Sequence, residues 1–297
     1  MLSEKLLKCL ICPVCGGAPL GLTVVEADGE RIIEARLNCS DCKRWYPVRD
    51  DIPAMMPPDL GSNLSAADDR WEGWGAAMHR FLRWRESAWA DPEAAAKRRE
   101  SARAMHERFI DFCDLQDEPL DLLDIGCGTG HVADLLPETV SYVGIDPLAG
   151  GRSPSGEMPA EIPRPQRQVS VVQGVGELLP MADDSFDAAL LMGVLDHARS
   201  TSEVLDEAAR VLRPGGVLGV LVAFTRTDES GGLADVLRSL MRSLTAQQGP
   251  HAQDTHLHTF FSVDEVAELV AHRFEVRDVM EYSNRAFVRA SAEGACV

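Results

Sequence analysis

The chain has 297 residues, of which 45% are hydrophobic, and its formal net charge is −18 at pH 7. This length accommodates one large domain or two smaller ones, and the negative charge argues against a nucleic-acid partner held by broad electrostatic attraction. The sequence contains no apolar run long enough to span a bilayer, and its first residues, Met1-Leu-Ser-Glu-Lys5, lack the apolar core of a signal peptide. We therefore expect a soluble cytoplasmic protein without a membrane partner.

Two C-x2-C pairs mark the N-terminal part of the chain: Cys12 with Cys15, and Cys39 with Cys42. Four thiolates brought together by two such turns form a tetrahedral zinc site. Segments 22–26 and 31–37 between the pairs are strand-like, and the Asp28-Gly29 dipeptide that separates them favours a hairpin turn. The pattern predicts a zinc ribbon, although Cys9 with Cys12 has the same spacing and offers a second ligand choice.

The segments 6–17 and 46–53 resemble the small zinc-ribbon activator proteins of tRNA and translation-factor methyltransferases, a module also found fused ahead of methyltransferase domains. The resemblance implies that Cys12 and Cys15 bind Zn²⁺ and that Cys9 does not. We expect a zinc-ribbon domain over residues 1–60, in which structural zinc supplies much of the folding free energy because so short a segment buries little core. We expect the zinc ribbon to pack on the rest of the chain and not to form a second active site.

Residues 61–118 are predicted to form a linker and a helical lid, after the breaks at Pro57-Pro58 and Gly61-Ser-Asn63. Four of the five tryptophans lie at positions 71, 74, 84 and 89, interleaved with arginines. This composition is compatible with base stacking, with a lid like those that small-molecule methyltransferases place over the cofactor, or with a helix core, since Trp74, Met78 and Phe81 have helical spacing. The acidic charge favours the lid or the core.

The segment 120–130 reads as a buried strand followed by a glycine-rich turn, with Gly126, Gly128 and Gly130 at alternate positions and Asp124 just ahead of them. A dinucleotide fingerprint has the pattern G-x-G-x-x-G, so the earlier third glycine indicates a different ligand. The helical spacing of residues 131–136 predicts a helix start directly after the turn. The acid-x-G-x-G-x-G pattern resembles the cofactor loop of class I S-adenosylmethionine (SAM) methyltransferases.

Three later segments extend this resemblance in the right order. Asp146 ends the apolar run 140–145, residues 183–187 lead into the run 188–195, and residues 212–216 lead into the run 217–222. The resemblance implies an α/β fold with a Rossmann-like seven-stranded methyltransferase sheet over residues 119–297, and SAM as cofactor. It assigns cofactor contacts to Asp124, Gly126, Gly128 and Gly130, and an acid such as Asp146 accepts hydrogen bonds from both ribose hydroxyls.

The adenine side of the site departs from the common pattern. Relatives carry Asp-Ala after the third strand, which here is segment 169–173, whereas this chain has Val175-Gly176. We therefore predict that the Gly176 N–H and the Glu177 carboxyl take part of that role. Four prolines between residues 147 and 168 predict an irregular loop in place of a crossover helix. Met192, after the fourth strand, is expected to line the site.

Histidines are the candidate catalytic residues. His197 follows the fourth strand, where it serves either as a general base or as a residue that fixes a loop. His256 and His258 either face the substrate, as the resemblance implies, or form a metal-binding pair. Ser262 and Glu265 match a capping box, which would start a helix over residues 262–270 and orient the preceding histidines.

These features predict a SAM-dependent methyltransferase that acts on an oxygen, nitrogen or carbon nucleophile of a small-molecule acceptor, secondary metabolites included. One alternative is an enzyme that methylates RNA or protein and docks through the zinc ribbon. Another is a SAM-binding scaffold protein without turnover. The acceptor and the oligomeric state are left open by the sequence.

Overall fold

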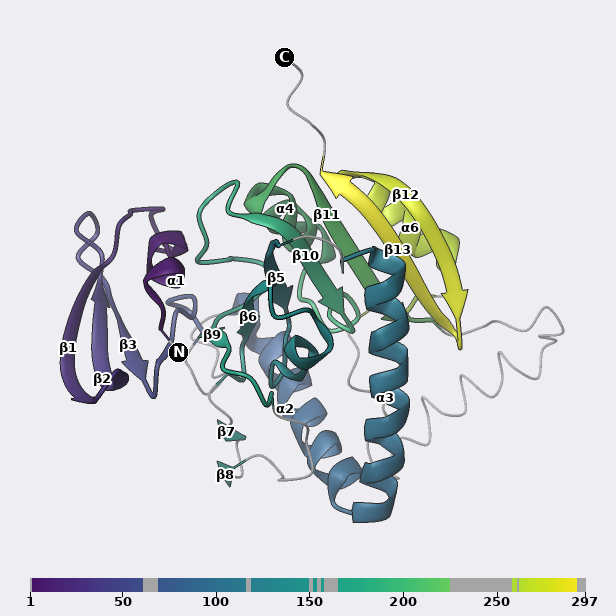
Figure 1. Ribbon diagram of the computed structural model, residues 1–297, viewed down its shortest axis with the longest axis horizontal. Coiled ribbons are helices and arrows are strands. Elements are labelled where there is room, and N and C mark those ends of the chain that lie inside the picture. Colours follow the sequence, from purple (N-terminus) through teal and green to yellow (C-terminus); the bar gives the residue numbers. More distant parts are fainter. Residues whose placement is uncertain are drawn as a thin grey trace, which may run out of the picture.

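The computed structural model describes residues 2–60, 69–115, 119–149, 152–153, 156–157, 165–224, 258–260 and 262–292. Its main body is a twisted sheet with helices on both faces, and a small N-terminal module lies beside one end of that sheet (Figure 1). His256 lies outside the described residues.

The N-terminal module consists of one short helix and a four-stranded antiparallel sheet in the order β1-β2-β3-β4. Helix α1 spans Glu4–Cys9, and the strands span Gly21–Asp28, Arg31–Asn38, Trp45–Arg49 and Ile52–Pro53. Strands β1 and β2 pair as the predicted hairpin, in which Asp28 is opposite Arg31. Gly29 in the turn has a φ of +61°, a conformation that favours glycine.

The large sheet has seven strands in the order β12-β13-β11-β10-β5-β6-β9. Its first five strands in the chain are β5 (Asp121–Ile125), β6 (Ser141–Asp146), β9 (Ser170–Gln173), β10 (Phe186–Met192) and β11 (Leu212–Ala223), followed by β12 (Phe274–Tyr282) and β13 (Arg285–Ala292). The first five are parallel, and β13 runs antiparallel between β11 and β12. This topology confirms the predicted Rossmann-like methyltransferase sheet.

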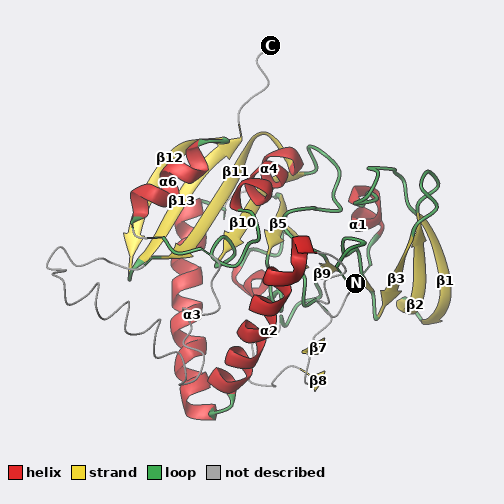
Figure 2. Ribbon diagram, turned by 180° about the vertical axis from the view of Figure 1, so that it is seen from behind, coloured by secondary structure: helices red, strands yellow, loops and turns green. Residues whose placement is uncertain are grey.

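Alternate residues of the central strands face two separate cores, as the period of a strand requires. Leu122 and Leu190 face a core that contains Phe109 and Ile110 of helix α3 (Pro92–Cys113). Their neighbours in the chain, among them Leu123, face the other core with helix α4 (Thr201–Val211). The two views accordingly place α3 over one face of the sheet, and α4 with α6 (Val263–Ala271) over the other (Figure 2).

Helix α2 (Asp69–Trp89) runs back along α3 and carries the tryptophans. Trp71 is 1% exposed and Trp74 is 5% exposed, and they pack with Met56, Leu60 and Val175 in a third buried cluster. Their helical spacing therefore produces a packed core, one of the three interpretations that the sequence left open. The same helix reaches the ligand cavity described below.

The N-terminal module is joined to the sheet edge by backbone hydrogen bonds. Ala54, directly after β4, forms a parallel bridge with Gln173 of β9, and the Met55 N–H donates to the Gln173 carbonyl at 2.8 Å. The Ile11 N–H donates to the Pro180 carbonyl at 3.0 Å. Since side chains of this module, such as Leu6 and Leu37, belong to the same buried core as β9 and β10, the module and the sheet share one hydrophobic core.

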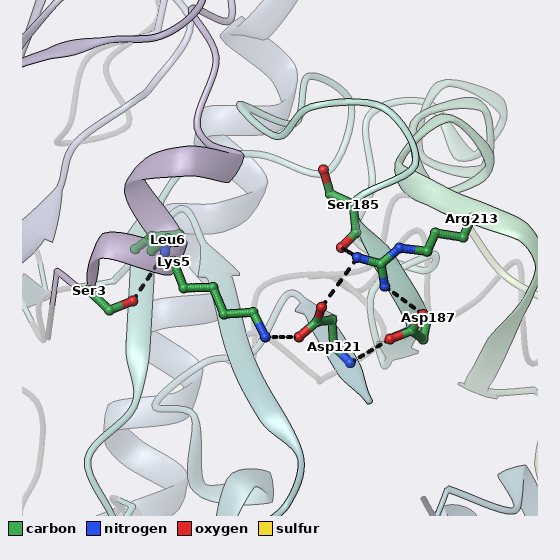
Figure 3. A network of polar contacts seen from close by, with 7 residues as sticks. All are labelled: Ser3, Lys5, Leu6, Asp121, Ser185, Asp187 and Arg213. Carbon is green, nitrogen blue, oxygen red and sulfur yellow. Dashed lines mark hydrogen bonds and ion pairs between the residues drawn. The ribbon is translucent and has the colours of Figure 1, made fainter. Parts of the chain in front are cut away.

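An ion-pair network ties α1 to the beginnings of three sheet strands (Figure 3). Lys5 of α1 pairs with Asp121 at the start of β5. Arg213 of β11 contacts Asp121 at 3.2 Å and Asp187 of β10 at 2.5 Å, and it also donates to the Ser185 carbonyl at 2.8 Å. The network therefore fixes the module at the sheet end opposite the glycine loop.

Two local expectations need adjustment. The segment after the glycine loop is a five-residue 3-10 helix, η1 (His131–Leu135), because Pro137 follows it directly and disfavours helical backbone at Leu136. Within the described part of segment 147–168 there is a two-stranded ribbon, β7 (Arg152–Ser153) with β8 (Gly156–Glu157), and no helix.

Candidate active site

The glycine loop connects β5 to η1 at the carboxyl end of the central strands. Gly126, Gly128 and Gly130 have φ angles of +74°, +58° and +80°, which L residues rarely adopt. At Gly126 a Cβ atom would also lie 2.4 Å from Val194 Cγ2, whereas at Gly128 it would meet no atom within 4 Å. Gly126 is thus required for packing between two loops, and Gly128 leaves open space in front of the backbone.

Asp124 is fully buried beneath this loop. Its Oδ2 accepts a hydrogen bond of 2.6 Å from the Tyr142 hydroxyl, while Oδ1 has no hydrogen-bond partner among the described residues. Burial raises the pKa of Asp124 to about 7; the Tyr142 hydrogen bond opposes this shift, and the nearby Asp146 carboxylate adds to it. Asp124 therefore keeps one buried oxygen without a hydrogen-bond partner among the described residues.

Asp146 ends β6 and holds the loop in place. Its Oδ2 accepts from the Gly128 N–H at 2.9 Å, and its Oδ1 accepts from the Leu148 N–H at 2.7 Å. Burial raises the pKa of Asp146, while these backbone hydrogen bonds and the guanidinium of Arg85 counteract that rise. The acid that the sequence assigned to a ribose thus also braces the glycine loop.

A cavity of about 210 Å³ lies between the glycine loop and helix α2. Its lining includes Gly126, Gly128 and Asp146 on the loop side, and Trp74, Met78 and Phe81 on the helix side. Of the predicted cofactor residues it also includes Gly176, Glu177 and Met192, whereas Asp124 and Gly130 are not among its lining residues. Asp124 is buried against Tyr142, and Gly130 is the N-cap of η1.

Helix α2 is fastened to the loop after β10 by side-chain contacts. The Trp74 indole N–H donates to the His197 carbonyl at 3.0 Å, and the rings of Phe81 and His197 are 4.7 Å apart. The guanidinium of Arg199 lies over the Trp71 ring at 4.9 Å. These contacts give the cavity a predominantly apolar and aromatic wall opposite the glycine loop.

Glu177 lines the cavity, but its carboxylate is directed to the backbone of the loop before α4. Its Oε1 accepts from the Arg199 N–H at 2.6 Å and from the Ser200 N–H at 3.4 Å. Burial raises the pKa of Glu177. The Glu177 carboxyl therefore holds the loop before α4, in addition to the adenine contact that the sequence predicts for it. Gly176 packs closely, since a Cβ there would lie 3.1 Å from Ile125 Cγ2.

The catalytic candidates converge on one loop. The His197 ring lines the cavity, and its Nε2 lies 3.9 Å from Asp196 Oδ2, beyond hydrogen-bond range. The His258 N–H donates to the Asp196 carbonyl at 3.1 Å, which places residue 258 beside the same loop. The buried Nε2 of His258 has no hydrogen-bond partner among the described residues. His256 is outside the described part of the chain, and its role stays a prediction.

The capping prediction downstream of His258 is confirmed. Ser262 is the N-cap of α6, and its hydroxyl accepts from the Glu265 N–H at 3.1 Å. Arg85, four residues after Phe81 on α2, is a cavity-lining residue that the sequence interpretation did not assign to the site. The i, i+4 spacing from Phe81 is the signal that indicates it, because both side chains then share one helix face.

The N-terminal cysteines form the predicted metal site. The Sγ atoms of Cys12, Cys15, Cys39 and Cys42 all lie within 4.8 Å of one another, with 3.6 Å between Cys12 and Cys42 and 3.5 Å between Cys15 and Cys39. Zinc–sulfur bonds of about 2.3 Å in a tetrahedron imply sulfur separations of about 3.8 Å. The donor set and the spacing fit structural Zn²⁺, and Cys9 is not part of the cluster.

Comparisons with known proteins match both parts of the chain. Residues 3–51 match the family described as "Trm112p-like protein", and residues 123–220 match the family described as "Methyltransferase domain". An uncharacterized methyltransferase of Mycolicibacterium gilvum is 37% identical over 100 residues, which cover 33% of this chain and 37% of the relative. A sterol 24-C-methyltransferase of Gibberella zeae is 31% identical over 159 residues, which cover 52% of this chain and 38% of the relative.

A solved structure supports the fold over most of the chain. The 1,6-didemethyltoxoflavin-N1-methyltransferase of Burkholderia thailandensis, crystallised with 1,6-didemethyltoxoflavin and S-adenosylhomocysteine, has a TM-score of 0.51 and 18% identity. The match covers 90% of this chain and 98% of that one. In the described part of the chain, no helix combines the length and apolarity that crossing a membrane requires. Residues 3–51 thus form a Trm112p-like segment whose four cysteines fit zinc, and residues 123–220 match a methyltransferase domain within a sheet of the Rossmann-like class.

Proposed function

We propose that this protein transfers a methyl group from SAM to an oxygen, nitrogen or carbon nucleophile of a small-molecule acceptor. The observation that carries the proposal is the cavity between the glycine loop and the aromatic residues of α2. A cavity enclosed by a helix favours an acceptor that is small enough to be surrounded, with an apolar or aromatic body that packs against Trp74, Met78 and Phe81. The sterol and toxoflavin methyltransferases that resemble parts of this chain support the same substrate class.

Some residues of the site would bind the cofactor, and others would accept a proton from the acceptor. Gly126, Gly128 and Asp146 would hold the cofactor, and the open space in front of Gly128 leaves room for a ligand close to the backbone. When bound, SAM supplies a methyl group that its sulfonium has already activated. The protein therefore contributes mainly alignment and exclusion of water, both of which α2 provides.

His197 is the proposed general base. Its ring reaches the cavity from the carboxyl end of β10, where Nε2 would accept a proton from an acceptor hydroxyl or amine. Phe81 packs on one side of the ring and limits its rotation. His258 is a second candidate on the same loop cluster, since the Asp196 carbonyl holds its backbone. His256 stays a prediction from the sequence.

The test is transfer of label from methyl-labelled SAM into an extract of the source cells, separated into small-molecule, protein and RNA fractions. Label in the small-molecule fraction is expected, and label in protein or RNA would favour the alternative in which the zinc ribbon docks a macromolecule. S-adenosylhomocysteine binding without label in any fraction would favour the scaffold alternative. With the acceptor in hand, His197→Asn should lower kcat by roughly 10²–10⁴-fold and leave cofactor affinity unchanged.

Charge reversal on α3 separates the first two alternatives further. Lys97 and Arg98 are exposed. The Lys97 ammonium group pairs with Glu93 of the same helix. Changing Lys97 and Arg98 to glutamate should leave turnover of a small molecule intact. If this basic segment guides a macromolecular substrate, the charge reversal should instead raise KM, and the increase should be larger at low ionic strength, where charges are screened less.

A further inference from the structure

The cavity has an arginine on the side opposite the glycine loop. Arg85 belongs to α2, lines the same cavity as Asp146 and Gly128, and lies with its guanidinium 5.5 Å from the centre of the Phe81 ring. Phe81 in turn packs against His197. The guanidinium is therefore placed by the aromatic wall of α2 and faces the cofactor side of the cavity.

Three charged side chains line the cavity, and two of them, Arg85 and Asp146, interact electrostatically. Burial lowers the pKa of Arg85 and the carboxylate of Asp146 raises it, while Arg85 in turn lowers the pKa of Asp146. The third, Glu177, is bonded to the backbone at residues 199 and 200. A ligand that enters between Arg85 and Asp146 therefore meets a cation on one side and an anion on the other.

A ribose diol suits such a pair. Each hydroxyl has one donor and two acceptor lone pairs, so a diol that donates both protons to Asp146 still offers lone pairs to a donor on the opposite side. A guanidinium supplies several N–H donors in a planar fork. Asp146 alone would satisfy only the donor half of the diol.

We propose that Arg85 is a cofactor-binding residue contributed by α2, and that it donates hydrogen bonds to the ribose hydroxyl oxygens of the adenosyl group from the side opposite Asp146. The inference rests on the proposed function, because it takes the cavity as the SAM site. It makes α2 part of the cofactor site as well as a wall for the acceptor.

Calorimetric titration of the full chain tests the proposal without knowledge of the acceptor. The ligands are S-adenosylhomocysteine and 5′-methylthioadenosine, which share the adenosine but differ in the amino-acid tail. Arg85→Met keeps the apolar stem and removes the donors, so we expect both affinities to fall by at least about tenfold, the loss that one charge-assisted hydrogen bond implies. Arg85→Lys keeps the charge without the fork, and its losses should be smaller. Arg83→Met, an exposed arginine of the same helix, is the matched control and should bind both ligands as the wild type does.

Each other result contradicts the proposal in a recognisable way. A loss confined to S-adenosylhomocysteine would assign Arg85 to the carboxylate of the amino-acid tail, and affinities within about threefold of wild type would remove it from the cofactor site. Wild-type protein that binds neither ligand would contradict the proposed function itself. Thermal unfolding of each variant verifies the fold. If Arg85→Met does not fold, the affinities of Arg85→Lys for both ligands test the proposal in its place.

Discussion

Replacing Gly126 with alanine tests the packing of the glycine loop directly. The added Cβ would lie 2.4 Å from Val194 Cγ2, and the φ of +74° is unfavourable for any residue with a Cβ. The left-handed conformation costs about 1–2 kcal/mol, and overpacking in a tight site costs about 1–3 kcal/mol. We therefore expect Gly126→Ala to lower the unfolding free energy by about 2–5 kcal/mol.

Gly128→Ala is the matched control, because its φ is +58° but its Cβ would contact nothing within 4 Å. It should show the backbone cost alone, about 1–2 kcal/mol. Any entropic gain from removing a glycine in the unfolded chain is the same for both variants. The difference between them therefore measures the collision with Val194.

The assay is urea unfolding of the ligand-free proteins, followed by circular dichroism. Val194→Ala removes the colliding methyl group, so the double variant Gly126→Ala, Val194→Ala should be more stable than the sum of the single effects by about 1–3 kcal/mol. Equal stabilities of Gly126→Ala and Gly128→Ala, or strict additivity in the double variant, would refute the assigned contact.

Three further predictions concern the metal, a buried acid and the attachment of α2. Cys39→Ser or a strong chelator should remove bound zinc, which a colorimetric metal assay counts. Because both parts of the chain share one core, the loss of zinc should lower the Tm of the whole chain and not only of its N-terminal part. An unchanged Tm would show that the two parts unfold independently. Asp124 has its pKa raised to about 7, above its unfolded value of about 3.9, so its stabilising contribution is complete below about pH 4 and is lost as the pH rises through about 7. The unfolding free energy of Asp124→Asn relative to wild type should therefore rise between pH 5 and pH 8, and a constant difference would contradict the assignment. Trp74→Phe removes the hydrogen bond to the His197 carbonyl and should cost about 1 kcal/mol or more, with a lower kcat once an acceptor is known. Trp84→Phe, on the same helix, lies outside the cavity lining and should change kcat little.

Much of the site was predictable because its signals are local. Three glycines at alternate positions after a buried strand specify a left-handed turn, and the structure has positive φ at all three. Two C-x2-C pairs around a hairpin likewise bring four sulfurs together, as the cluster confirms. In both cases the spacing along the chain limits the geometry, so few residues suffice to identify the feature.

Other features depended on contacts between distant segments. The helical spacing of Trp74, Met78 and Phe81 indicated a helix, but not that these side chains both pack in a buried cluster and line a cavity. Glu177 illustrates the same limit, since its carboxylate bonds to backbone N–H groups more than twenty residues later in the chain. No spacing rule within one segment predicts such a partner.

The sequence by itself determined most of the sheet strands, the glycine-rich turn and the two C-x2-C pairs, because hydrophobic period, glycine placement and cysteine spacing act over short distances. The tertiary structure decided where these parts meet. It joined the zinc-binding domain to the free edge of β9, folded α2 across the glycine loop, and placed Arg85 opposite Asp146. These arrangements follow from burial of apolar surface and from pairing of charges between segments that are far apart in the chain, which only the folded state brings together.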